Sequence, residues 1–110
     1  MEIAPLKSFL AIAREGHLTR AARALHLSQP AVSAQLASLE DDLGTALFHR
    51  TPKGMELTEA GELFRGYAEQ ALLFLDDGRE ALDALRGLQA GSLAVGGGAT
   101  ATTYLSLIHI

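Results

Sequence analysis

Residues 19–44 read TRAARALHLSQPAVSAQLASLEDDLG, and this stretch decides the fold of the chain. Thr19 is a good N-cap for a short helix that runs through the alanines to Leu25. Ser28 can cap the next helix, in which Pro30 falls in the first turn, where a missing N–H costs nothing. Apolar side chains repeat at helical spacing along it until Gly44: Val32, Leu36, Leu39 and Leu43. Two short helices joined by a tight turn form a helix-turn-helix.

The turn between these helices consists of His26 and Leu27. Histidine is one of the residues that tolerate a left-handed backbone, so His26 can take the place that glycine often has in this motif. Ala22 is small enough to let the two helices cross closely. Four apolar side chains are expected to form the core between the helices: Leu25, Leu27, Val32 and Leu36.

The opposite face of the helix that follows Ser28 is unusual for a solvated surface, because it carries no charge before Glu40. With Leu36 placed inward, a step of about 100° per residue directs small or neutral side chains outward. These are Pro30, Ala31, Ala34, Ala37 and Ser38, with Ser33 and Gln35 on the flanks and Ser28 and Gln29 at the N-terminal end. Small residues permit close approach to base edges in the DNA major groove, and Gln and Ser can hydrogen-bond them. The alternative is that this alanine-rich face packs against another helix.

Four basic residues fit the same interpretation. Arg20 and Arg23 lie on the first helix of the motif, which crosses the DNA backbone in helix-turn-helix proteins. Arg50 and Lys53 flank a predicted hairpin, where a wing could contact phosphate or the minor groove. For each of the four, a solvated surface charge is the alternative.

Further elements are expected on both sides of the motif. A helix from about Ala4 to Arg14 precedes it and ends at Gly16. Two short strands follow it, joined by the turn sequence Thr51-Pro52-Lys53-Gly54. Thr58 then caps a long helix whose pattern continues to about Leu88.

The long helix is apolar on more than one side, and the residues before it are too few to cover it. We therefore expect it to pair with a second copy of the chain. The residues expected in that dimer interface are Phe64, Tyr67, Ala71, Phe74, Leu82 and Leu85. A module that forms mixed dimers with longer relatives, without contacting DNA itself, is the competing hypothesis.

The distribution of charge is compatible with DNA binding. The net charge is −4. Residues 1–57 carry six basic and six acidic side chains, so the entire −4 comes from residues 58–110, which carry three basic and seven acidic ones. A neutral first half can bind phosphates where its basic residues share a face, although it is a weak non-specific binder.

Composition excludes several other classes of protein. The 110 residues are 48% hydrophobic and contain no cysteine, so a core is possible whereas disulfides and cysteine zinc sites are not. The chain start does not resemble a signal peptide, and no apolar run approaches the roughly 20 residues of a membrane span. We expect a cytoplasmic protein with no membrane partner.

Enzyme chemistry has little support. The histidines at positions 17, 26, 49 and 109 lack the spacing of a metal site. The run Gly96-Gly97-Gly98 lacks the lysine and hydroxyl residue of a phosphate-binding loop. We therefore expect no catalytic residues, no metal and no cofactor.

Several ordered motifs resemble the LysR-type transcriptional regulators. They are AARALHLSQPAVS at 21–33, Leu39-Glu40, Leu43-Gly44, LFHR at 47–50 and LTEAG at 57–61, and the resemblance extends from about Leu6 to Leu105. It implies a mainly α protein, a winged helix-turn-helix followed by a long dimerisation linker helix. It also implies that Gln29, Pro30, Ser33 and Ala34 face the bases, with Ser28 at the start of the reading helix, and that the wing spans Phe48 to Leu57.

The same resemblance sets the expected domain organisation. Residues 1–58 form the DNA-binding domain, 59–88 the linker helix, and 89–110 the truncated start of an effector-binding domain. The family pattern ends near Leu105, so we expect a fragment without effector sensing. The family forms dimers on DNA, tetramers at full length, and binds a small-molecule effector in the domain that is missing here. We expect a dimer that reads an interrupted palindrome in double-stranded DNA.

Two positions depart from the family pattern. The family often has Arg at the position of Ala34, so one DNA contact is expected to be missing. It often has Ser at the position of His17, so capping of the helix is expected to depend on Thr19.

Overall fold

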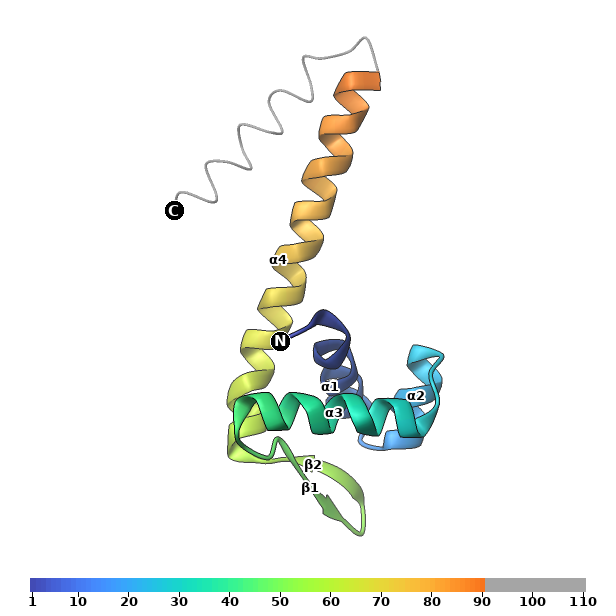
Figure 1. The fold of residues 1–110 in the computed structure, drawn as a ribbon, viewed down its shortest axis with the longest axis vertical. Helices are drawn as coiled ribbons and strands as arrows, with labels where there is room; N and C mark the ends of the chain where they lie inside the picture. The colour runs from blue at the N-terminus through green and yellow to red at the C-terminus, as the bar shows by residue number, and fades with distance from the viewer. Residues whose placement is uncertain (91–110) are drawn as a thin grey trace. The chain divides into compact units, whose positions relative to one another are not determined.

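The computed structural model describes residues 1–90, which are mainly helical (Figure 1). The elements are α1 (Ile3–Glu15), α2 (Leu18–Leu25), α3 (Gln29–Leu43), β1 (Phe48–Thr51), β2 (Gly54–Leu57) and α4 (Glu59–Ala90). A winged helix-turn-helix followed by a long helix is thereby confirmed. Chain contacts divide the protein into two compact units, Met1–Gln70 and Ala71–Ile110. The strand expected at 93–95 and the polar segment expected at 99–103 lie outside the described residues.

α1 packs against both α2 and α3 and provides the centre of the first unit. Pro5 lies in its first turn, and Gly16 ends it with a left-handed φ of 76°, as the sequence predicts. The helix begins one residue earlier and ends one residue later than expected. Phe9 and Ile12 are both 0% exposed, so the inner face of α1 is completely buried.

The turn into α3 is stabilised as expected. His26 adopts a left-handed φ of 58°, and the Ala31 N–H donates to Ser28 Oγ at 3.2 Å. Val32, Leu36 and Leu39 are buried along the inner face of α3, as predicted. Leu27 is the exception, because it is 42% exposed and does not form part of the core between the helices.

The N-terminus of α2 differs from the expectation. His17, not Thr19, is the N-cap, and its side chain makes no capping hydrogen bond. Its extended backbone (φ −146°, ψ 138°) begins the helix, and Thr19 lies within the first turn with its side chain exposed. The prediction that Thr19 caps this helix is therefore wrong by two residues.

The wing is a two-stranded antiparallel hairpin in which Phe48 pairs with Leu57 and Arg50 with Met55. Its turn requires Gly54, whose φ of +125° L-residues rarely adopt. The Met55 N–H donates to the Gly16 carbonyl oxygen at 2.8 Å. The base of the hairpin is therefore attached to the loop between α1 and α2.

Three aromatic rings hold the wing and the start of α4 against α1. The Phe9 ring centroid lies 5.4 Å from that of Phe48 and 5.5 Å from that of Phe64, both in tilted orientations. Such separations and tilts are typical of favourable aromatic pairs. A single buried ring thus joins α1, β1 and α4.

α4 begins against the segment that leads into the wing. Thr58 Oγ1 accepts from the Gly61 N–H at 3.0 Å and donates to the Ala46 carbonyl oxygen at 2.8 Å. The predicted cap at Thr58 is confirmed. Gly61 permits the close approach, because a Cβ there would overlap the Leu47 carbonyl oxygen.

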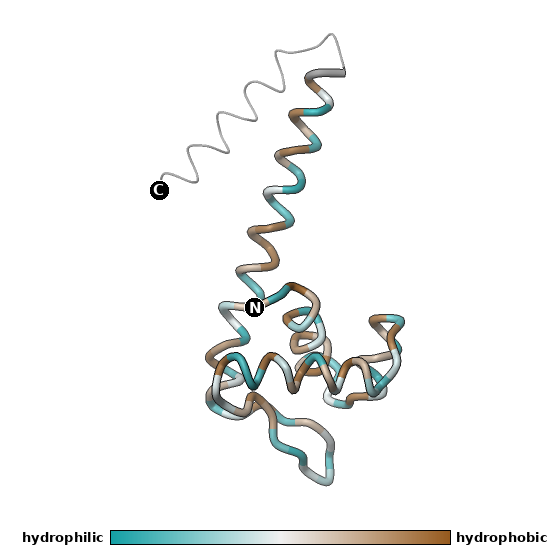
Figure 2. Tube along the Cα trace, in the orientation of Figure 1, coloured by the Kyte–Doolittle hydropathy of each residue, from teal (hydrophilic) through white to brown (hydrophobic). Residues whose placement is uncertain are grey.

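Beyond Gln70, α4 carries a mixture of apolar and polar residues in the described part of the second unit. Figure 2 shows brown and teal segments alternating along the helix up to Ala90. The helix extends two residues past the expected end at Leu88. None of the described helices is both long enough and apolar enough to span a membrane.

Candidate nucleic-acid interface

The N-terminal end of α3 presents an uncharged surface. Ser28, Pro30 and Ala34 are exposed, and Gln29 and Ser33 are half-buried. Farther along the helix Ala37 and Ser38 are also exposed, as the helical projection predicts, whereas Ala31 is half-buried. The five residues expected to face DNA bases therefore lie on the first two turns of one helix, with their N-cap bond formed.

Gln35 is held away from this surface. The Ser8 hydroxyl of α1 donates to Gln35 Oε1, and Ser8 is only 1% exposed. The sequence suggested a flanking position for Gln35 and offered no sign of its partner 27 residues earlier. This buried polar pair fixes the rotation of α3 about its axis, and with it the direction of the exposed face.

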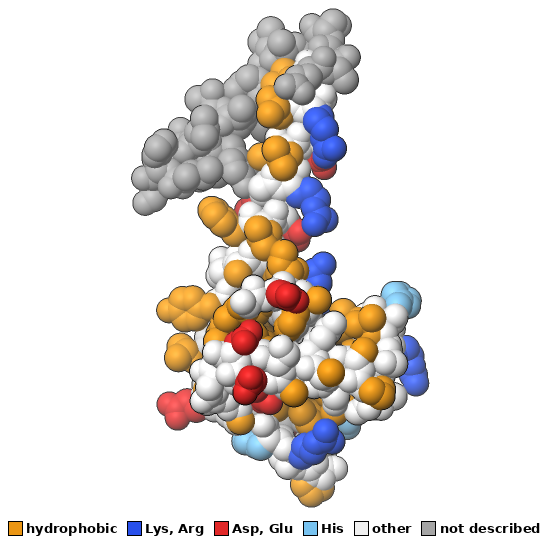
Figure 3. All heavy atoms as spheres, in the orientation of Figure 1, with side chains coloured by type: hydrophobic (Ala, Val, Ile, Leu, Met, Phe, Trp, Pro, Cys, Tyr) orange, Lys and Arg blue, Asp and Glu red, His pale blue; other side chains and the backbone are white. Residues whose placement is uncertain are grey.

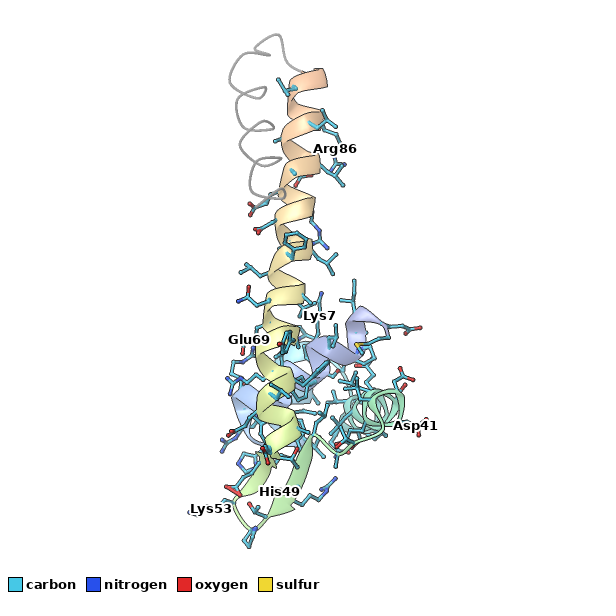
Figure 4. The ribbon with its side chains drawn as sticks, turned by 90° about the vertical axis from the view of Figure 1, so that its left-hand side faces the viewer. Lys7, Asp41, His49, Lys53, Glu69 and Arg86 are labelled. Carbon is cyan, nitrogen blue, oxygen red and sulfur yellow. The ribbon has the colours of Figure 1, made fainter. Side chains whose placement is uncertain are left out.

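The wing contributes its two basic side chains near α3. Arg50 lies on β1 and is exposed, while Lys53 lies in the turn, where its N–H donates to Thr51 Oγ1 at 3.1 Å. Figure 4 shows Lys53 at the tip of the wing and His49 on the strand that leads to it. Because alternate residues of a strand face opposite sides, Arg50 and His49 point to different faces of the hairpin.

The other two predicted basic residues lie on α2. Arg20 and Arg23 are exposed and, with Glu15 and Ala24, line a shallow concave surface. The Glu15 carboxylate pairs with Arg14 at 3.1 Å. In Figure 3, basic side chains lie beside α2 and the wing, whereas acidic side chains gather at the C-terminal end of α3. The charge in this unit is therefore segregated, which makes a neutral domain able to present a basic side.

A cavity of about 240 Å³ lies where α2, α3 and the wing meet. Its lining combines polar and basic residues from all three: His17, Leu18, Thr19, Gln29, Arg50, Thr51, Gly54 and Met55. Gln29 and Arg50, predicted separately as a base contact and a wing contact, thus border the same hollow.

Glu40 has a role that the sequence did not reveal. Its Oε2 accepts from the Leu47 N–H at 2.6 Å and lies 3.4 Å from the Phe48 N. The carboxylate therefore connects the end of α3 to the start of the wing. In sequence, Glu40 is one of three consecutive acidic residues, and only its place in the Leu39-Glu40 motif distinguished it from the solvated Asp41 and Asp42.

The residues predicted for dimerisation differ in what they already contact. Phe64 is half-buried against Phe9 in the first unit, where Tyr67 is 71% exposed. In the second unit, Ala71 is exposed and the large side chains of Phe74, Leu82 and Leu85 are 64%, 61% and 47% exposed. Exposed aromatic and leucine side chains at this density are typical of surfaces that associate.

This combination of a capped, uncharged helix face, a basic wing and a close helix crossing defines a helix-turn-helix regulatory protein. A family model described as the bacterial regulatory helix-turn-helix proteins of the lysR family matches residues 3–62. The chain belongs to this family, which comprises regulators and not enzymes.

Individual relatives agree with this assignment. The chain is similar to a probable RuBisCO transcriptional regulator of Cyanidioschyzon merolae, with 45% identity over 91% of this chain and 33% of the relative. It is 48% identical to the HTH-type transcriptional regulator BudR of Klebsiella aerogenes, over 83% of this chain and 62% of BudR. The chain therefore spans less than two thirds of the length of either relative.

A solved structure matches the fold itself. The crystal structure of the CbnR_DBD–DNA complex superposes with a TM-score of 0.74 and 38% sequence identity. The match covers 78% of this chain and 99% of the CbnR chain.

Proposed function

We propose that this chain is a DNA-binding transcriptional regulator that reads base sequence through the N-terminal end of α3. The observation that carries the proposal is the exposed, uncharged surface formed by Ser28, Pro30 and Ala34, with Gln29 and Ser33 beside it. An α-helix fits the major groove, and small side chains let its backbone approach the base edges. A regulator of DNA acts beside the chromosome, so we expect it in the cytoplasm.

The chemistry of this surface suits direct readout. Gln29 can form two hydrogen bonds with adenine, Ser28 and Ser33 can bond several bases, and Ala34 can contact the thymine methyl group. Arg20, Arg23, Arg50 and Lys53 supply phosphate contacts from α2 and the wing. The similarity to CbnR_DBD, which was crystallised with DNA, supports this division of roles.

Removing the Gln29 amide should lower affinity for the preferred DNA site only. Gln29→Ala, and likewise Ser33→Ala, is expected to cost about 1–3 kcal/mol for each lost base contact. Binding to random DNA, which depends on phosphates, should change little. Fluorescence anisotropy with selected and scrambled duplexes measures both affinities.

Ser38→Ala is the matched control, because Ser38 is exposed on the same helix but farther from its N-terminus. It should leave both affinities unchanged. Equal losses on selected and scrambled DNA for Gln29→Ala would contradict direct readout by this residue.

We further propose that two copies pair through α4 and place two α3 helices on an interrupted palindrome. The interface would use Phe64, Tyr67, Ala71, Phe74, Leu82 and Leu85, with Phe64 contributing the edge that Phe9 leaves open. In this organisation residues 1–58 bind DNA, 59–88 pair the subunits, and 89–110 begin an effector-binding domain. Tetramers and effector response would require that domain in full.

A charge placed in this interface should separate the subunits. Leu82→Glu is expected to raise the dimer dissociation constant by more than about 100-fold, since an unpaired buried charge costs several kcal/mol. Sedimentation equilibrium at micromolar concentration measures it. Glu80→Gln, an exposed position two residues away, should leave the dimer intact. A wild-type monomer that binds DNA tightly would contradict the dimer proposal.

A further inference from the structure

The cavity between α2, α3 and the wing contains a histidine that the DNA-reading surface described above does not use. The His17 ring is half-buried and faces the wing: a Cβ built on Gly54 would lie 2.8 Å from its Nδ1. Its side chain makes no capping hydrogen bond to α2, so capping does not account for its position. The ring lies instead at a junction between three elements, all within the first unit.

The cavity has the chemistry of an anion site. Arg50 is the one charged side chain among its eight lining residues in the described part of the chain. Thr19, Thr51 and Gln29 add groups that can donate hydrogen bonds. A guanidinium, hydroxyls and an imidazole arranged around one hollow suit a phosphate better than an apolar or cationic ligand.

Acidic groups nearby are directed elsewhere. Glu15, before the His17 loop, pairs with Arg14 and borders the separate surface of Arg20 and Arg23. Glu56 on β2 is paired in register with His49, one position from the Arg50–Met55 pair, and therefore faces the opposite side of the hairpin. α3 brings only Gln29 to the cavity.

We propose that this cavity holds one phosphate of the DNA backbone and that His17, when protonated, donates a hydrogen bond to it beside Arg50. The inference rests on the DNA binding proposed above. Gln29 borders the cavity and also starts the reading helix, so a phosphate held here lies next to the base contacts. Histidine gains its charge within the range of about pH 5 to 8 and then has two N–H donors.

The consequence is a phosphate contact that exists at low pH and is lost at high pH. Each neutralised phosphate steepens the dependence of log affinity on log salt concentration by about 0.9. The slope should therefore be steeper by about 0.9 at about pH 6 than at about pH 8. At about 0.15 M salt this corresponds to roughly five-fold tighter binding at the lower pH.

The test measures salt slopes at both pH values for the 110-residue chain, His17→Gln and His49→Gln, with selected DNA. His49 is the matched control, because it is an exposed histidine on the other face of the wing. The pH-dependent difference should disappear in His17→Gln and persist in His49→Gln. Circular dichroism at each pH verifies that the variants are folded.

Three results would overturn the proposal. One is a wild-type slope that is the same at both pH values while specific DNA binding persists, which leaves the proposed function intact. Another is an unchanged pH difference in His17→Gln. The third is saturation of the His17 ring signals by inorganic phosphate alone in an NMR titration, which would make a free anion the occupant. Absence of DNA binding at either pH would overturn the proposed function together with this inference.

Discussion

Replacing Phe9 with alanine is expected to lower the free energy of unfolding by about 3–5 kcal/mol, the typical cost of removing a buried aromatic side chain. Phe9 is 0% exposed and contacts the rings of Phe48 and Phe64. The truncation would leave a cavity between α1, the wing and α4 and remove both aromatic pairs. DNA affinity should fall as well, because the wing and α3 would lose their common support.

Urea unfolding followed by circular dichroism measures this loss. Lys7→Ala is the control, since Lys7 is exposed on the same helix (Figure 4) and its removal should change stability by no more than about 0.5 kcal/mol. A loss below about 1 kcal/mol for Phe9→Ala would show that the aromatic cluster does not hold these elements together.

Gly61→Ala provides the second large effect, and here two physical arguments oppose one another. Alanine is favoured over glycine inside a helix by about 1 kcal/mol, so helix propensity alone predicts a stabilised protein. The structure predicts the opposite. A Cβ at Gly61 would overlap the Leu47 carbonyl oxygen and lie 2.9 Å from Leu57 Cδ2. We expect overpacking to prevail and to cost about 1–3 kcal/mol.

The same helix offers a control at Gly66, where a Cβ would meet nothing within 4 Å. Gly66→Ala should stabilise the protein by up to about 1 kcal/mol. The two substitutions are thus expected to change the melting temperature in opposite directions. A stabilising Gly61→Ala would mean that α4 does not approach the segment before the wing as closely as described.

The features that could be predicted from sequence are those encoded locally. The N-cap at Ser28, the left-handed His26 and the Gly54 turn each depend on one residue and its immediate neighbours. Their chemistry is visible in the sequence. The buried face of α3 was also predictable, because the spacing of its apolar residues follows the helical repeat.

The errors and omissions have the opposite origin. Thr19 has the better capping chemistry, but α2 begins earlier, at His17, where the loop is held by the hydrogen bond from Met55 to Gly16. Leu27 is apolar yet 42% exposed, since periodicity does not specify the orientation of a turn residue.

The long-range polar contacts gave no signal at all. Gln35 bonds Ser8, and Glu40 bonds the Leu47 N–H, across 27 and 7 residues respectively. Each pairing becomes visible only when the helices are placed together. These contacts orient α3 and the wing, so the part of the site hardest to predict is the part that aims it.

The position of Ala34 shows what this surface lacks. The family resemblance associates this position with Arg, whereas here it is a small exposed residue on the outward face of α3. Specificity must therefore depend on Gln29 and Ser33 and on close approach of the helix, while Arg and Lys on α2 and the wing provide affinity.

Selection of bound sequences from random double-stranded DNA, with the purified chain and with Gln29→Ala in parallel, tests the central claim most directly. The account predicts enrichment of an interrupted palindrome by the wild-type chain, and relaxed preference in the variant at one position of each half-site. Enrichment of no sequence, or of the same sequences to the same extent by both proteins, would contradict readout by the N-terminal end of α3.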